Sequence, residues 1–260
     1  MLYRISQWVL DLGIPICPIH LSKNKSEGAI QYLENHNELM YWASLSENPF
    51  AINLIKKNMD KVQFRHLCAN SEGLDIVDHY HTSWYYLSSN PSIFTPDMFE
   101  YYFHANDFLV YIYVDRDEFS RNPSPHAIKL LENNIDYISW EYLSMNPSAM
   151  KLLFQYPHKI DWVTLNFNPA PEAVELLKCN PDKIVWKYFA KNPTAIQMLK
   201  ENKEYITDQY IWENPAIFEI DYETMAKQRM DVLREELMMV TLHPTRIEKW
   251  LNEGLTIDDL

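Results

Sequence analysis

The cluster of side chains that most resembles a metal site lies around His79 and His81, preceded by Asp75 and Asp78, with His104 as a more distant candidate. Zinc sites use three or four convergent ligands, usually at characteristic spacings, and those spacings do not occur here. The surrounding sequence predicts a loop, so solvated surface histidines are the favoured interpretation. An enzyme using His79 and His81 stays as the least favoured of three functional hypotheses.

His66 and Cys68 have the residue types of an imidazole–thiol nucleophile pair. Cys68, however, stands two residues before Asn70, a position that equivalent segments fill with serines such as Ser46 and Ser88. This regularity indicates turn chemistry, in which short hydroxyls near helix ends bond to the backbone. With 4 glycines in the chain, a glycine-rich phosphate loop is also excluded. We therefore expect no catalytic residue, no bound metal and no cofactor.

These residues are placed by a repeated phrase that begins with Asn-Pro. Asparagine is a favoured N-cap, and proline suits the first helical position because its missing N–H would have no partner there. Each of these register asparagines is therefore predicted to begin a helix. The register asparagines are Asn48, Asn90, Asn122, Asn146, Asn168, Asn192 and Asn214, with Asn24 and Asn70 as degenerate members.

Apolar residues recur at fixed distances from each register asparagine. Side chains three residues apart share one face of a short helix, so these columns predict a continuous core. The residue three before the asparagine is Leu45, Leu67, Leu87, Phe119, Leu143, Leu165, Phe189 or Ile211. The residue six before it is an aromatic in most copies: Trp42, Phe64, Trp84, Trp140, Trp162 and Trp186. We interpret these tryptophans as core residues.

The spacing of the register asparagines alternates. From Asn122 the steps are 24, 22, 24 and 22 residues, and the longer steps contain two extra residues in the helix opening. The sequence therefore predicts an all-α helical-repeat solenoid of 22–24-residue two-helix units with a 46-residue super-repeat. We interpret the alternation as two geometries of helix entry.

Three regions follow from this pattern. Residues 1–20 lack the phrase and are predicted to form an N-terminal cap, since open solenoid ends must be covered. Residues 21–221 form the predicted solenoid, with an irregular insert at about 93–121. Residues 222–260 are predicted to form a C-terminal helical cap, with a long helix first and then a second helix after His243-Pro244.

The insert is unusually aromatic, and aromatic residues are enriched at protein interfaces. It is a candidate partner-binding surface through Tyr101, Tyr102, Phe103, Phe108, Tyr111 and Tyr113. The favoured alternative is a distorted repeat whose aromatic side chains are internal, because exposed apolar runs are normally tolerated only under a partner.

Composition limits the function classes. The formal charge of -13, without a Lys/Arg cluster, argues against nucleic-acid binding. The 3 separated cysteines indicate a reducing compartment. No apolar run reaches the length of about 20 residues that a membrane span needs. We expect no signal peptide, because Asp11 interrupts the first apolar residues.

The phrase Trp-x-x-Leu-Ser-x-Asn-Pro-x-Ala-x-x-Leu-Leu, best preserved from Trp140 to Leu153, resembles the Asn-Pro helical repeats of nucleocytoplasmic large DNA viruses, the giant viruses. The closing stretch from Glu236 to Gly254 is similar to an ending of such proteins. The unit also resembles the leucine-rich variant repeat, which alternates α and 3₁₀ helices, although the Asn-Pro caps and the tryptophan column depart from that family. The viral resemblance implies a virion component or a protein of the infected host cytoplasm.

The first hypothesis is a non-enzymatic protein–protein interaction scaffold, in one form a minor structural, capsid-associated protein of a large DNA virus. The second is an adapter that recruits a host protein during infection. Both imply viral or host protein partners, no nucleic acid and no membrane insertion.

Overall fold

A computed structural model describes residues 1–77, 83–95 and 114–253. The predicted all-α class is confirmed: the described chain is mostly helical, and its one two-stranded sheet pairs β1 (Tyr3–Ile5) with β2 (Phe218–Ile220). The chain divides into two compact units, one spanning Ile5–Glu219 and the other combining Met1–Arg4 with Ile220–Leu260. We call the first of these the repeat unit.

Short helices fill the repeat unit. Its α-helices are α1 (Gln7–Leu10), α2 (Pro18–Lys23), α3 (Glu27–Asn35), α4 (Trp42–Glu47), α5 (Ile52–Lys57), α6 (Phe64–Leu67), α7 (Trp84–Ser88), α10 (Arg116–Ser120), α11 (Pro125–Asn133), α12 (Trp140–Ser144), α13 (Met150–Gln155), α14 (Trp162–Leu165), α15 (Pro171–Cys179), α16 (Trp186–Phe189) and α17 (Ile196–Glu201). Its 3₁₀ helices are η1 (Asn37–Leu39), η2 (Pro49–Ala51), η3 (Met59–Lys61), η4 (Pro91–Phe94), η5 (Ile135–Tyr137), η6 (Pro147–Ala149), η7 (Pro157–Lys159), η8 (Pro181–Lys183), η9 (Pro193–Ala195), η10 (Lys203–Tyr205), η11 (Gln209–Glu213) and η12 (Pro215–Ile217).

Every register asparagine is buried and donates from Nδ2 to two backbone carbonyls; in all but Asn24, whose Oδ1 accepts the Ser26 hydroxyl, Oδ1 also accepts the backbone N–H two residues later. Asn146, fully buried, donates from Nδ2 to the carbonyl oxygens of Ser120 at 3.0 Å and Asn122 at 2.8 Å, both in the preceding segment. Its Oδ1 accepts the backbone N–H of Ser148 at 3.0 Å. Both donors and the acceptor of the amide are thereby used, as a buried amide requires. The asparagines therefore link each segment to the one before it.

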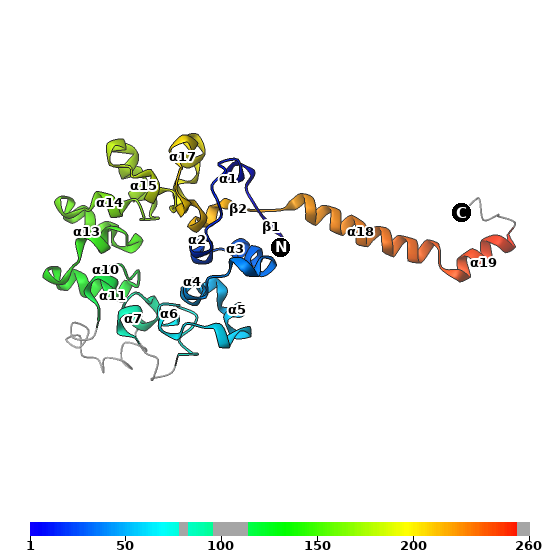
Figure 1. The fold of residues 1–260 in the computed structure, drawn as a ribbon, viewed down its shortest axis with the longest axis horizontal. Coiled ribbons are helices and arrows are strands. Elements are labelled where there is room, and N and C mark those ends of the chain that lie inside the picture. Colours follow the sequence, from blue (N-terminus) through cyan, green and yellow to red (C-terminus); the bar gives the residue numbers. More distant parts are fainter. Residues whose placement is uncertain (78–82, 96–113, 254–260) are drawn as a thin grey trace. The chain divides into compact units, whose positions relative to one another are not determined.

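The same bonds join the two ends of the series. Asn24 donates from Nδ2 to the carbonyls of Trp212 at 3.0 Å and Asn214 at 2.8 Å. The indole N–H of Trp212 donates to the Pro15 carbonyl at 2.9 Å. The first register asparagine is thus bonded to the last one, 190 residues away. Within the repeat unit the helices follow a closed circuit (Figure 1).

This closure corrects the expectation of open ends covered by caps. The predicted N-terminal cap, residues 1–20, is divided: residues 5–20 belong to the repeat unit, and α2 begins inside the predicted cap, at Pro18. Leu21, in α2, is fully buried three residues before Asn24, so the apolar column begins one copy earlier than the sequence indicated.

A second set of bonds involves the residue two before each register asparagine. Ser144 Oγ donates to the Trp140 carbonyl at 2.7 Å and accepts the Asp161 N–H at 2.9 Å. Asn166 fills the same position with an amide that donates to the Trp162 carbonyl at 2.8 Å and accepts the N–H of Val185. The interpretation of these serines as turn residues is confirmed.

The alternating openings correspond to two helix entries, as interpreted from the spacing. After a long opening a nine-residue α-helix follows, as in α3, α11 and α15. After a short opening a 3₁₀ turn precedes a six-residue α-helix, as in η6 and α13 or η9 and α17. The prediction that each register asparagine begins a helix is confirmed for the short openings and is wrong for the long ones. In the short opening it caps a 3₁₀ turn, and in the long one the α-helix begins three residues later.

The core consists mainly of aliphatic residues, with Phe94, Phe119, Phe189 and Trp212 also fully buried. The apolar residues three before each register asparagine are buried, with Leu45, Leu143 and Ile211 at 0% exposure. The tryptophans six before it, such as Trp140 and Trp162, are only half-buried and pack against the edge of that core. The interpretation of the tryptophans as core residues needs this correction. Indoles are large enough to be highly buried without being enclosed.

In the second unit, the predicted helical stretch after Tyr222 is confirmed as α18 (Tyr222–Thr241), followed by α19 (Pro244–Asn252). Asp221 caps α18 by accepting the Thr224 N–H at 3.0 Å. Arg4 lies 3.9 Å from the Asp221 carboxylate.

We predict that Asn146→Ala lowers the free energy of unfolding by about 2–5 kcal/mol, because two buried carbonyls each lose a donor. Urea denaturation followed by circular dichroism measures this loss. Asn133→Ala, at an exposed position of α11, is the matched control and should change stability by less than about 0.5 kcal/mol. Equal effects of the two substitutions would show that the amide bonds do not hold the segments together.

Candidate functional site

Most of the side chains singled out by the sequence lie outside the described residues. This holds for the candidate partner-binding residues Tyr101, Tyr102, Phe103, Phe108, Tyr111 and Tyr113, and for Asp78, His79, His81 and His104. Of the proposed metal cluster only Asp75 is described, in an exposed ion pair with Lys56 at 3.4 Å. Among the described residues no group of three or more His, Cys, Asp or Glu side chains could hold a metal ion.

Cys68 behaves as a repeat substitution. Its thiol is buried and donates to the Phe64 carbonyl at 3.5 Å, the same bond that the serines form. Burial raises the pKa of this thiol, partly opposed by a hydrogen bond from the Ser83 backbone. A raised pKa reduces the thiolate fraction, and the imidazole of His66 is bonded to Glu47 instead. The described geometry does not form a Cys–His nucleophile pair.

The residues that stand four positions and one position before each register asparagine form a different surface. We call this surface the inner wall. The position four before is His20, Ser44, His66, Tyr86, Glu118, Tyr142, Thr164, Tyr188 or Tyr210. The position one before is Lys23, Glu47, Ala69, Ser89, Arg121, Met145, Phe167, Lys191 or Glu213. Unlike the buried columns at the register asparagine and at two and three residues before it, these positions change chemistry from copy to copy, and most are only half-buried.

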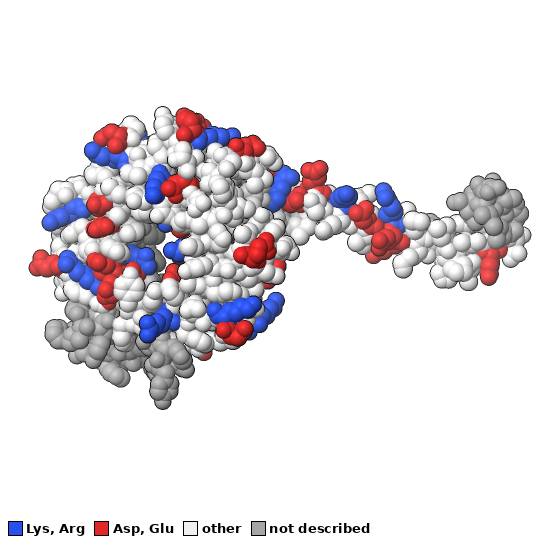
Figure 2. Space-filling view, viewed as in Figure 1, with Lys and Arg blue, Asp and Glu red and all other residues white. Residues whose placement is uncertain are grey.

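The inner wall faces the middle of the repeat unit. Lys25 lies close enough to Arg121, Glu47 and Glu213 for their charges to shift its pKa, although these residues belong to well-separated copies. Such proximity requires side chains that converge from different parts of the circuit. Figure 2 shows a hollow at the centre of this unit, with basic and acidic side chains around it.

The pKa of Lys25 is lowered. Desolvation is the largest cause of its lowered pKa and the charge of Arg121 is the next, while Glu47 and Glu213 partly oppose both. Lys25 is nevertheless exposed to solvent, which screens these effects. A charge kept at such a position is typical of binding surfaces.

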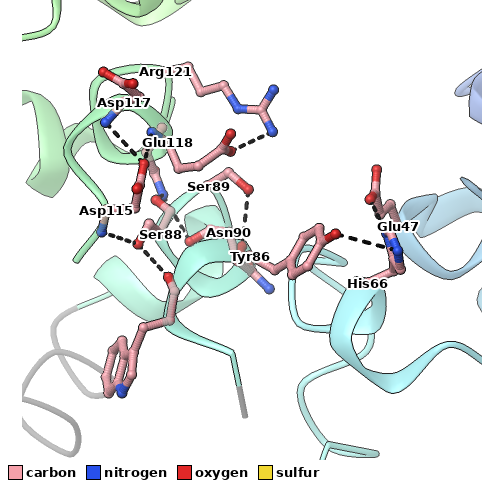
Figure 3. Close-up of polar contacts among 12 residues, drawn as sticks. Glu47, His66, Tyr86, Ser88, Ser89, Asn90, Asp115, Asp117, Glu118 and Arg121 are labelled. Atoms are coloured by element: carbon pink, nitrogen blue, oxygen red, sulfur yellow. Dashed lines mark hydrogen bonds and ion pairs between the residues drawn. The ribbon is translucent and has the colours of Figure 1, made fainter. Parts of the chain in front are cut away.

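Two carboxylate–imidazole pairs occupy equivalent places on the wall. His66 Nδ1 lies 2.5 Å from Glu47 Oε1, and His20 Nδ1 lies 2.5 Å from Glu213 Oε1 across the closure. In Figure 3 the Tyr86 hydroxyl points at the other nitrogen of His66, at 3.4 Å. Beside it lies a cavity of about 510 Å³ lined by Phe64, Arg65, His66 and Tyr86, among others.

Glu118 and Arg121 form the next cluster along the wall. The Glu118 carboxylate is 5% exposed and lies 2.5 Å from the Arg121 guanidinium (Figure 3). Burial raises the pKa of Glu118, and the charge of Arg121 and a hydrogen bond from Tyr85 partly oppose that rise. The side chain of Arg121 itself is 42% exposed, so it can also contact a ligand.

Aromatic rings surround a lysine on the far side of the circuit. The Lys191 ammonium lies 4.7 Å from the Phe167 ring centre and 4.8 Å from that of Tyr210, and 2.8 Å from Glu213. Tyr188 packs against both rings, with centroids at 4.7 Å and 5.9 Å. Cation–π contacts and the ion pair hold this lysine in place.

The sequence pattern alone did not indicate the inner wall, because its positions share no single residue type. A signal does exist: the position four before the asparagine is Tyr or His in six of nine copies. Its chemistry suits recognition of a protein segment with mixed charge and aromatic content. The described wall presents no activated nucleophile.

In comparisons with known proteins, no family model, no curated protein sequence and no solved structure matches the chain. Among the described helices, none is both long and apolar enough to cross a lipid bilayer.

We predict that Glu118→Gln flattens part of the pH dependence of stability. Because the folded pKa of Glu118 is raised, the folded state binds a proton more tightly than the unfolded state. Wild-type stability therefore falls as the pH rises from the unfolded glutamate pKa, about 4.3, through the raised folded value. Urea titrations across this range should show a smaller fall for Glu118→Gln. Parallel curves for the two proteins would contradict the raised pKa.

Proposed function

We propose that the protein is a non-enzymatic helical-repeat scaffold that binds a protein partner through its inner wall. The observation that carries this proposal is the contrast between columns. The asparagine column keeps one residue type and the column three residues before it stays apolar and buried, whereas the wall positions vary in charge and aromatic character. A fixed frame with variable, solvent-facing positions is typical of repeat proteins that recognise other proteins.

The arrangement of charges supports binding rather than turnover. The histidines His20 and His66 are paired with carboxylates, and Glu118 is paired with Arg121. Desolvation and the charge of Arg121 lower the pKa of Lys25, an exposed residue that forms no ion pair among the described residues. A partner carboxylate placed there would offset the repulsion from Arg121.

Particle association is a narrower form of this proposal, supported by the resemblance of the Asn-Pro phrase to giant-virus repeat proteins. Mass spectrometry of purified virus particles tests it. Presence in particles at a fixed ratio to the capsid protein supports a structural role, and expression confined to infected cytoplasm supports recruitment of a host protein instead.

We predict that a photo-crosslinking amino acid placed at Tyr142, on the inner wall, captures one defined partner in the native cell. The same substitution at Phe154, an exposed residue of α13, is the control and should capture none at comparable yield. With the captured protein purified, the double variant Arg121→Ala/Tyr210→Ala should weaken its affinity by about tenfold or more, about 1.4 kcal/mol. Equal capture at both positions, or an unchanged affinity, would remove the inner wall from this role.

A further inference from the structure

The long helix α18 carries an apolar stripe with coiled-coil spacing. Ala226, Met230, Leu233, Leu237 and Val240 follow one another at intervals of 4, 3, 4 and 3 residues. This alternation keeps the side chains along one face of an α-helix and is the pattern by which one helix packs along another. Leu233 is 48% exposed, Met230 61% and Val240 59%.

A groove runs beside this stripe within the same unit. It has a volume of about 520 Å³ and is lined by Met1 and Leu2 together with α18 residues that include Val232 and Leu233. The first residues of the chain thus widen the apolar surface of the helix on one side. A helix of 20 residues gains most of its stability from packing such a face.

The charges of α18 are arranged about the stripe. Lys227 and Arg234 flank it on one side and Arg229 on the other, where Glu236 is the one acid. Asp231 and Glu235 lie on the opposite face of the helix. Among the described ion pairs none involves the three basic side chains. Residues that flank a heptad stripe select the partner by charge.

We propose that α18 binds an amphipathic α-helix of another protein whose apolar stripe is flanked by aspartate and glutamate. A second copy of this chain fits less well, because its own α18 would bring the same basic flanks into contact. An anionic lipid surface fits less well because the helix carries acids on its other face and the chain has a formal charge of -13.

Two designed peptides test this proposal with the whole 260-residue chain. Both have about four heptads with leucine at the stripe positions. One has glutamate at all flanking positions and the other has lysine. Fluorescence anisotropy should show that the glutamate peptide binds at least about tenfold more tightly than the lysine peptide, by a margin that shrinks with added salt.

Three variants test which residues of α18 contact the peptide. Leu233→Asp should abolish binding of the glutamate peptide. Arg229→Glu/Arg234→Glu should reverse the preference toward the lysine peptide. Glu235→Lys, on the opposite face, is the matched control and should leave the preference unchanged. Circular dichroism establishes that each variant is folded.

Several outcomes would overturn the proposal. Equal binding of both peptides, or of neither, removes the charge recognition. Dimerisation in sedimentation velocity that Leu233→Asp abolishes would assign the stripe to a second copy. Binding only to phosphatidylserine vesicles would assign it to a lipid surface.

Discussion

The fold depends on what a buried asparagine amide requires. Each register asparagine has two N–H donors and one acceptor oxygen with no access to water, so all three must find protein partners. The Nδ2 donors reach two carbonyls of the preceding segment, and Oδ1 caps the turn that follows. One side chain therefore fixes a segment both to its neighbour and to its own helix. Aspartate lacks the donors, and glutamine would add a methylene between backbone and amide.

Closure follows from repeating this bond. The series contains nine register asparagines, and the amide of the first, Asn24, donates to the carbonyls of Trp212 and Asn214. Among the residues that the structure describes, the closed circuit leaves no open end of the core, whereas open stacks need terminal caps to cover such ends. The circuit also brings the inner-wall residues toward a common space. There, after desolvation, the charges of Arg121 and Glu213 act on the pKa of Lys25, the first lowering it and the second raising it.

The helices could be predicted from sequence because their signals are local. Each of these signals acts within one or two neighbouring segments. They are the Asn-Pro openings, the apolar column through Leu143 and Leu165, and the alternating spacing of the register asparagines. Closure could not be predicted, since it depends on small rotations summed over the whole series. The tryptophans were interpreted as core residues but lie at the edge of the core. Periodicity shows which residues share one face of a helix, but it does not show how deeply each of them is buried. The inner wall could not be predicted because its residues occupy equivalent positions in the repeat but differ in amino-acid type.

The closure at Asn24 is tested most directly by comparing Asn24→Ala with Asn146→Ala in urea denaturation. In a closed circuit both substitutions remove the same two buried hydrogen bonds, one pair at the seam and the other within the series. We expect losses in the free energy of unfolding that agree within about 1 kcal/mol, each in the range of about 2–5 kcal/mol. A loss below about 0.5 kcal/mol for Asn24→Ala, with the full loss for Asn146→Ala, would show that the ends do not meet.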